Sequence, residues 1–294
     1  MQNIKPLSSR TLTAQVSGGL GNQLFQYFAG YDLSLKMRSQ LKVDARWIES
    51  SYSQSESDIR DFKFLNDAAI ITKIESGEIN FRLERLKTKI ASKSRSASKF
   101  FGLRAPNSPG FIEFNDLKLG VELRGYFQSY KYFENVNMTL NMWDWSLKNE
   151  SHLFLETKHD LDSAPFIAIH VRGGDYLNKS NIYHKLGSKY YLDSLKDLKE
   201  KIGGIRVLVF SDDPEHARNI FSSDASIEIL KQDGLRASEA MILMSSAKGI
   251  ITANSTFSYW AAMINAGNHI YAPKFWYTNT EADENLYPPH WKLV

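Results

Sequence analysis

The segment from residue 166 to 176 constrains the fold of this chain more than any other feature. It opens with the apolar run Phe166 to Ile169, which is rich in β-branched residues and long enough for a buried strand. Three reactive side chains and a glycine pair follow within a few positions: His170, Arg172, Asp175, Gly173 and Gly174. Because ligands in open α/β sheets bind at the carboxyl ends of parallel strands, the segment indicates an anion site with chemistry attached. A surface turn with a structural ion pair is the alternative.

Strands and helices alternate regularly after residue 151, which predicts a doubly wound parallel sheet. The expected strands are 205–210, 227–230, 249–252 and 269–272, and the expected helices are 189–201, 238–246 and 255–266. Pro214 is well placed to open a further helix. A chain of 294 residues fits two domains of about 150 residues each. We therefore expect domains at 1–150 and 151–294.

A glycine-rich turn lies near the start of the chain. Residues 12–16 read as a strand, residues 17–23 as the turn, and residues 24–37 as a largely apolar helix. In this arrangement backbone N–H groups and a helix N-terminus can hold a phosphate, and Gly19 and Gly21 let it approach the backbone. Tight packing of the helix on the strand is the alternative reading.

A second turn of this kind covers residues 253–258, just before the last expected helix. It offers hydroxyl groups and a helix N-terminus, and with Arg172 it can hold two phosphates without a metal ion. Helix capping alone is the alternative. Asp212 and Asp213 follow another expected strand and are candidates for hydrogen bonds to a base or ribose. They are too few for a convincing metal chelate.

Composition narrows the class of protein. The net charge is +3, which is not diagnostic of a nucleic-acid partner, and cysteine is absent. No apolar run approaches the ~20 residues of a membrane span, and residues 1–10 lack the apolar core of a signal peptide. We therefore expect a soluble cytoplasmic enzyme or binding protein. Residues 82–104 carry eight basic residues and one acid, which suits either a solvated helix face or peripheral contact with an anionic membrane.

Six motifs, taken in order, resemble the signature of the bacterial α-1,2-fucosyltransferases. They are residues 18–26 (GGLGNQLFQ), 125–129 (GYFQS), 170–176 (HVRGGDY), 210–213 (FSDD), 253–262 (ANSTFSYWAA) and 273–277 (PKFWY). Each motif is modest alone, but together they run from about residue 12 to residue 277.

The resemblance implies a GT-B type fold, with two Rossmann-like domains facing a central cleft. Residues 1–150 would then form the acceptor-side domain and residues 151–294 the GDP-fucose-binding domain. The implied reaction moves L-fucose from GDP-β-L-fucose to a galactose hydroxyl of a glycan, with inversion and without a metal or other cofactor. Synthesis of O-antigen or another surface polysaccharide is the implied setting. A related transferase with another GDP-sugar or linkage, or a non-catalytic nucleotide-sugar binding module, is the alternative.

The resemblance also assigns roles to residues. Arg172 matches the arginine that neutralises the departing diphosphate, His170 and Asp175 are the two candidates for a general base, and Asn22 faces the fucose and diphosphate. The implied donor contacts are Gly19, Gly21, Asn22, His170, Arg172, Asp212, Glu239, Asn254, Ser255, Thr256 and Phe257. The chain departs from the family pattern at Gly173, where a second arginine is usual, and at Ala240. We expect Gly173→Arg to be tolerated, unless the glycine adopts a backbone conformation closed to other residues.

Overall fold

The computed structural model describes residues 11–49, 58–65, 69–72, 80–93, 103–104, 111, 113, 122–137, 140–173, 183–265, 267, 269–278 and 280–294. The chain forms two compact units. Unit 1 comprises Met1–Leu140 and Asp283–Tyr287, and unit 2 comprises Asn141–Ala282 and Pro288–Val294. The first division thus lies between residues 140 and 141, and the chain returns to unit 1 for five residues near its end.

Unit 1 contains a parallel sheet of five strands in the order β3-β2-β1-β5-β4. The strands are β1 (Thr11–Gln15), β2 (Gln40–Asp44), β3 (Ile70–Ile71), β4 (Leu103–Arg104) and β5 (Glu122–Leu123). Strand β1 pairs with β2 on one side and with β5 on the other. The order of the strands reverses at β1, and the loops at 16–19 and 124–129 follow β1 and β5.

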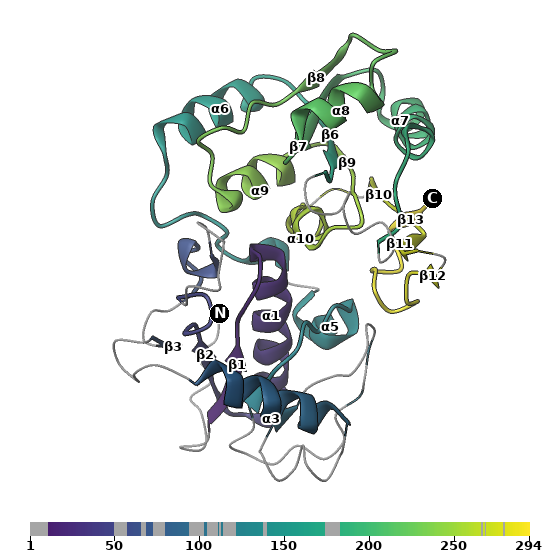
Figure 1. Ribbon diagram of the computed structural model, residues 1–294. Helices are drawn as coiled ribbons and strands as arrows, with labels where there is room; N and C mark the ends of the chain where they lie inside the picture. The colour runs from purple at the N-terminus through teal and green to yellow at the C-terminus, as the bar shows by residue number, and fades with distance from the viewer. Residues whose placement is uncertain are drawn as a thin grey trace. The chain divides into compact units, whose positions relative to one another are not determined.

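Helix α1 (Leu20–Met37) follows β1 and is buried along most of its length (Figure 1). The other helical elements in the described part of unit 1 are η1 (Ile59–Asp61), α3 (Phe81–Lys93), η3 (Tyr130–Phe133), α5 (Glu134–Asn137) and η4 (Leu140–Met142), the last of which crosses into unit 2. The basic segment 82–104 is therefore not one continuous element, because its helix ends at Lys93 and strand β4 covers residues 103–104. Residues 94–102 lie outside the described part of the chain.

Unit 2 contains a parallel sheet of six strands in the order β13-β10-β9-β6-β7-β8. The strands are β6 (Phe166–Val171), β7 (Arg206–Ser211), β8 (Ile227–Ile229), β9 (Gly249–Ile251), β10 (Ile270–Ala272) and β13 (Lys292–Leu293). A separate antiparallel pair is formed by β11 (Phe275–Tyr277) and β12 (Thr280–Glu281). Counted in chain order within the unit, the six strands run 3-2-1-4-5-6, the order of a doubly wound dinucleotide-binding sheet.

Helices cover both faces of this sheet (Figure 1). They are α6 (His152–Asp162), α7 (Ser188–Ile202), α8 (Pro214–Ile220), α9 (Ala237–Ser245) and α10 (Thr256–Ile264). Ile167, Ile169 and Val171 of β6 share a core with apolar residues of α7 and α8. Because side chains alternate along a strand, His170 points to the other face, where its ring lies 5.2 Å from that of Phe257 on α10. All six residues of β6 are buried, as a strand covered on both faces requires.

The predicted α/β class with parallel sheets is confirmed, and the predicted strands and helices of unit 2 are present with shifts of one or two residues at most of their ends. Pro214 opens α8 as predicted. Among the described helices, none is both long and apolar enough to cross a lipid bilayer.

Candidate functional site

The candidate site lies at the switch point of the unit 2 sheet. Strand β6 pairs with β7 on one side and with β9 on the other, and the connections run in opposite directions from it. His170 and Arg172 lie at the carboxyl end of β6, and Asp212 lies at that of β7. The turn at 253–257 follows β9. Ligands in open α/β sheets bind at this position. The fold therefore brings together three segments that are far apart in the sequence.

Arg172 is held at this edge by Asp212. Its Nη1 lies 2.6 Å from Asp212 Oδ2, and both side chains are about one-third exposed. Asp212 also accepts a hydrogen bond through Oδ1 from the backbone N–H of Gly173, at 2.8 Å. One carboxylate thus fixes both the guanidinium and the backbone of the residue after it. A guanidinium that is exposed and oriented in this way can pair with a phosphate.

His170 lies beneath this edge and is 4% exposed. Burial, together with the nearby positive charge of Arg172, lowers the pKa of His170 to about 3. Its Nδ1 has no hydrogen-bond partner among the described residues. The ring is therefore neutral at pH 7 and forms a wall of the site with one unsatisfied nitrogen. The role of general base predicted for His170 stays a prediction.

The N-terminus of α10 lies beside His170 through the ring contact with Phe257. Ser255 is the N-cap residue, but its side chain makes no capping hydrogen bond. The first-turn N–H groups and the positive end of the helix dipole are thus not satisfied by a side-chain cap, which is the arrangement that binds anions. Thr256 and Phe257 belong to this first turn, as the sequence predicted.

Asn254 has a structural role beside this turn. Its Nδ2 donates to the carbonyl oxygens of His184, at 2.8 Å, and Trp276, at 2.9 Å. The side chain therefore ties the turn after β9 to two other segments. This leaves only the amide oxygen of Asn254 for a donor contact, so the contact predicted for it stays a prediction.

Two aromatic pairs line the segments that Asn254 joins, and the sequence analysis did not identify their partners. The rings of Tyr183 and Tyr277 stack at 5.8 Å, and those of His184 and Phe275 lie 5.2 Å apart. Burial, and to a lesser extent the electrostatic effect of Tyr183, raises the pKa of Tyr277 to about 12. The late aromatic motif pointed to this region, but no local pattern indicated that residues 183 and 184 would pair with it.

Gly173 is a glycine for a steric reason. A Cβ atom placed there would lie 2.3 Å from Cβ of Asp213, which no real pair of atoms tolerates. Asp213 cannot move aside easily, because its carboxylate caps α8 by accepting from the N–H of His216 at 2.9 Å. The expectation that Gly173→Arg is tolerated is therefore wrong. The cause is the neighbouring side chain rather than a left-handed backbone, since the φ of Gly173 does not fall in that region.

Glu239 is fully buried and already has three donors. Its carboxylate accepts from the backbone N–H groups of Ser151, at 2.7 Å, and Arg236, at 2.9 Å, and from the Arg236 guanidinium at 3.0 Å. Burial by itself raises the pKa of Glu239, but these hydrogen bonds outweigh it and the net pKa is lowered. The contacts make Glu239 a cap of α9 and a tie to the start of α6. Its predicted contact with the nucleobase stays a prediction.

Asp175 lies outside the described residues, as does Gly174. Its predicted role as the general base therefore stays a prediction.

The glycine-rich turn of unit 1 is also built at a switch point, where β1 lies between β2 and β5. Asn22 is in the first turn of α1, and its Oδ1 accepts from Gln128 Nε2 at 3.0 Å. Gln26 bridges the same two loops, accepting from the N–H of Ser17 and donating to the carbonyl of Gly125. The N-cap residue Gly19 gives α1 no side-chain cap, so its first-turn N–H groups are not satisfied by one. Gly21 lies buried in that turn.

The sequence did not predict that Asn22 and Gln128 would be partners. Phe127, next to Gln128, adopts a φ of 50°, which is uncommon for a residue with a large side chain. Such outliers are often found where a loop is shaped for a ligand. Within the motif at 125–129, Gln128 holds the amide oxygen of Asn22.

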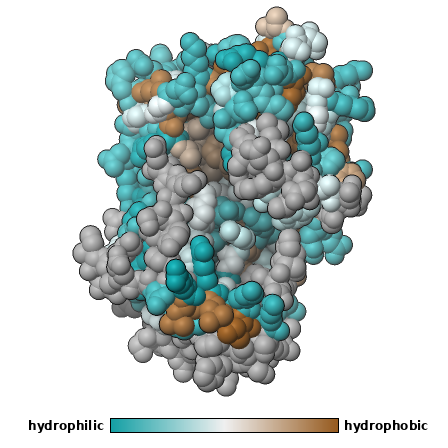
Figure 2. Space-filling model, in the orientation of Figure 1, coloured by the Kyte–Doolittle hydropathy of each residue, from teal (hydrophilic) through white to brown (hydrophobic). Residues whose placement is uncertain are grey.

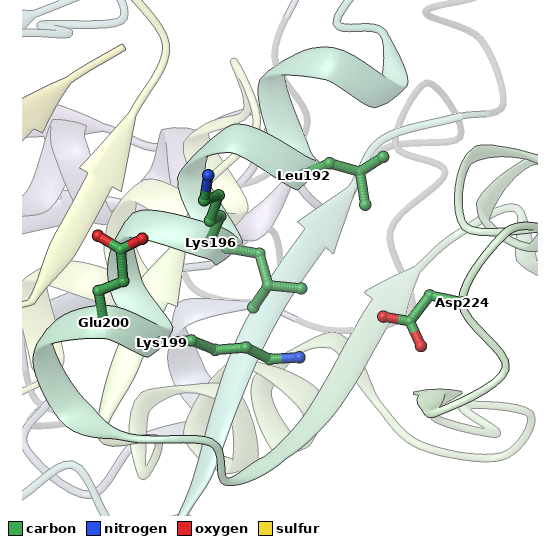
Figure 3. Close-up of a pocket in the computed structure, with 6 residues that line it drawn as sticks. Leu192, Lys196, Lys199, Glu200 and Asp224 are labelled. Carbon is green, nitrogen blue, oxygen red and sulfur yellow. The ribbon is translucent and has the colours of Figure 1, made fainter.

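A pocket of about 400 Å³ lies elsewhere in unit 2 (Figure 3). It is open to solvent and lined by residues of α7 and of the turn before β8: Leu192, Leu195, Lys196, Lys199, Glu200 and Asp224. Asp224 precedes β8 and the end of α7 leads into β7, so the pocket lies toward the amino ends of these strands. It belongs to the opposite edge of the sheet from Arg172. Among the described residues, no cluster of three or more His, Asp or Glu side chains could hold a metal ion.

Comparison with known proteins decides the family. The model of glycosyl transferase family 11 matches residues 11–294. The chain belongs to this family. The resemblance of its six motifs to the bacterial α-1,2-fucosyltransferases is thereby confirmed at the level of the family.

Two curated relatives and one solved structure are similar to this family 11 member. An alpha-1,2-colitosyltransferase of Escherichia coli is 28% identical over 263 residues, covering 86% of this chain and 87% of its own. The O-antigen biosynthesis glycosyltransferase WbnK of Escherichia coli is 28% identical over 294 residues, covering 89% and 93%. A crystal structure of NodZ alpha-1,6-fucosyltransferase soaked with GDP-fucose has a TM-score of 0.51 at 11% identity, covering 87% and 93%. The GT-B type fold predicted from the sequence is confirmed by this likeness.

Proposed function

We propose that this glycosyltransferase moves L-fucose from GDP-β-L-fucose to a galactose hydroxyl of a glycan, forming an α-1,2 linkage. The observation that carries the proposal is the edge of the unit 2 sheet, where His170 lies close to the charge of Arg172 and its ring contacts Phe257 in the uncapped first turn of α10. A guanidinium and a helix N-terminus are the two groups that bind a diphosphate without a metal. The GDP-fucose named in the NodZ structure and the α-1,2 linkage named in the colitosyltransferase support the donor and the linkage.

The proposed reaction is a single displacement. The acceptor oxygen bonds to the anomeric carbon as the bond from that carbon to the β-phosphate oxygen breaks, and GDP leaves with the bonding electrons. Arg172 would stabilise the charge that develops on the β-phosphate, which is commonly the largest electrostatic contribution in such sites. The hydroxyl proton needs an acceptor. Because the pKa of His170 is about 3, we assign this role to Asp175.

Two further polar residues, one in each unit, have roles in the proposal. Asp212 would keep the guanidinium in place before the donor binds, and then share it with the diphosphate. In unit 1, the contact of Asn22 with the donor stays a prediction. It would use the Nδ2 hydrogens, since Gln128 already occupies the amide oxygen. We propose that no metal ion takes part.

The acceptor belongs, we propose, to an O-antigen or another surface polysaccharide, as the name of WbnK suggests. The enzyme would then work in the cytoplasm, at the inner face of the membrane where lipid-linked glycans are made. A transferase that uses a colitosyl donor is the alternative, because one relative carries that name. A nucleotide-sugar binding module without turnover is the second alternative.

A donor and acceptor screen tests the proposal. The protein is incubated with GDP-fucose, GDP-mannose, a colitosyl donor or UDP-galactose, each with and without a β-galactoside, and the product is examined by mass spectrometry and NMR. We expect GDP release and an α-1,2-fucosylated galactoside only with GDP-fucose plus acceptor. Transfer from the colitosyl donor alone would select the first alternative, and binding of GDP-fucose without product would select the second.

A further inference from the structure

Helix α3 is anchored to unit 1 by one of its faces. Arg124, which is 6% exposed, reaches this face from the loop after β5. Its Nη2 lies 2.5 Å from Glu84 Oε2, and its Nη1 donates to the Glu84 carbonyl and to Thr88 Oγ1, both at 3.2 Å. Ala91, on the same face, is buried. These contacts fix the rotation of the helix about its axis, and so determine which residues face outward.

The outward face carries an apolar stripe. Leu83, Leu86 and Ile90 are 47%, 54% and 41% exposed. Their spacing of three and four residues places them in one row along the helix. Figure 2 shows brown, hydrophobic residues next to teal, hydrophilic ones where Figure 1 draws α3. Single exposed leucines are common on protein surfaces, but three in a row on one helix are not required by the packing of unit 1.

Basic side chains border this stripe on both sides. At about 100° of rotation per residue, Arg82, Lys89 and Lys93 fall on one flank and Lys87 on the other. Arg85 adds a further cation beyond the first flank. The helix has one acid, Glu84, which faces inward to Arg124 and is also bonded to Lys87 at 2.9 Å. Among the residues of α3 itself, the outward face thus combines apolar side chains with cations and has no carboxylate.

We propose that α3 lies on the surface of an anionic lipid bilayer, with Leu83, Leu86 and Ile90 inserted among the lipid chains and the flanking cations at the headgroups. An apolar row with cations on both flanks is the pattern of helices that lie in a membrane interface. A nucleic acid would contact the cations but not the leucines. The other partner that could cover this face is a protein with an acidic, partly apolar groove. The inference does not depend on the identity of the donor or acceptor.

Vesicle sedimentation tests this inference with the full chain. The probes are vesicles of phosphatidylcholine alone and of phosphatidylcholine with phosphatidylglycerol in equal parts, at low and at high salt. We expect binding to the anionic vesicles at low salt, weaker binding at high salt, and little binding to the neutral ones. Equal binding to both vesicles, or no binding to the anionic ones at low salt, overturns the proposal and leaves a protein groove as the occupant to seek.

Two sets of variants separate the charge from the apolar stripe. The double variant Arg82→Gln with Lys93→Gln should bind anionic vesicles roughly 30-fold more weakly, at about five-fold per charge. Leu86→Gln should weaken it on the order of ten-fold. If Leu86→Gln binds like the wild type while the charge variant does not, binding is purely electrostatic. The proposal that the leucines insert among the lipid chains is then wrong.

The matched controls lie in unit 2. Lys196→Gln with Arg218→Gln removes two exposed charges, and Leu155→Gln removes a leucine that is 49% exposed on α6. We expect both control proteins to bind anionic vesicles as the wild type does. If the controls lose as much binding as the α3 variants, the assignment of the membrane contact to α3 is wrong. All substituted residues are exposed, so circular dichroism should show unchanged folding. Transfer to a soluble galactoside should be unchanged in the α3 variants, which separates this inference from the proposed function.

Discussion

Adding one methyl group at residue 173 should destabilise unit 2 and disable its site. The new Cβ of Gly173→Ala would lie 2.3 Å from Cβ of Asp213, an atom fixed by the backbone and not by a flexible side-chain end. Either the turn after β6 or the N-terminus of α8 must then move. Overpacking of this kind costs about 1–3 kcal/mol, and displacing the Asp213 cap about 1 kcal/mol more. We expect the free energy of unfolding to fall by about 2–4 kcal/mol, measured by urea denaturation.

A double-mutant cycle isolates the cause. The three nearest atoms to the new Cβ all belong to the Asp213 side chain, so Asp213→Gly removes them together. Glycine is an acceptable N-cap, and this change should cost only a few tenths of a kcal/mol. In the Asp213→Gly background, Gly173→Ala should cost less than about 0.5 kcal/mol. The control is Gly204→Ala, since a Cβ there meets nothing within 4 Å.

Because Gly173 follows Arg172 directly, Gly173→Ala should also lower turnover, and Gly173→Arg should not rescue it. Equal destabilisation by Gly173→Ala in both backgrounds, or none in either, would refute the steric reasoning.

Three further predictions concern the same unit. If the diphosphate is bound by Arg172 and a helix N-terminus as proposed, activity should survive EDTA. A loss that magnesium or manganese restores would show that a metal takes part. In the folded protein the pKa of His170 is about 3, whereas its ordinary value is 6.5. Below about pH 6.5 the histidine is therefore protonated in the unfolded state but not in the folded state. The free energy of unfolding should fall as the pH drops through this range. At pH 5 the loss of stability should be about 2 kcal/mol smaller in His170→Phe than in the wild type, measured by urea denaturation at pH 7 and pH 5. An equal loss in both proteins would show that other groups cause the pH dependence. Glu239→Gln should lower the free energy of unfolding by about 1–3 kcal/mol, because the buried capping network loses its charge, and a neutral result would contradict the structural role.

The sequence was informative where side chains follow strands. The apolar run of β6 and the polar residues after it allowed the strand and the edge of the sheet to be predicted together, because both properties are local. The alternation of strands and helices gave the parallel sheet for the same reason. The turns at residues 19 and 255 were predicted from glycine and hydroxyl patterns, whereas the absence of a side-chain cap at Ser255 is seen only in the structure.

Long-range partners could not be predicted in this way. Asp212 was expected to contact a base or ribose, but in the structure it pairs with Arg172, 40 positions away. Gly173 was treated as a lost arginine, although its neighbour in space is Asp213. The lowered pKa of His170 comes mainly from its burial, which the short motif around it does not reveal. The contacts of Asp212 and Asp213 join the end of β7 to the end of β6, and no local pattern specifies that pairing.

The most direct test of the account is the effect of Arg172→Ala on turnover compared with its effect on GDP affinity. A donor that acts on developing charge matters more in the transition state than in the ground state. We predict that turnover of GDP-fucose with a galactoside falls on the order of 10²–10³, while the dissociation constant of GDP rises less than about ten-fold. Arg172→Lys should restore little, because an ammonium lacks the planar fork.

Arg206→Ala, at the opposite end of the neighbouring strand β7, is the control and should leave turnover unchanged. Near-normal turnover in Arg172→Ala would contradict the central claim that this edge of the sheet neutralises the departing diphosphate.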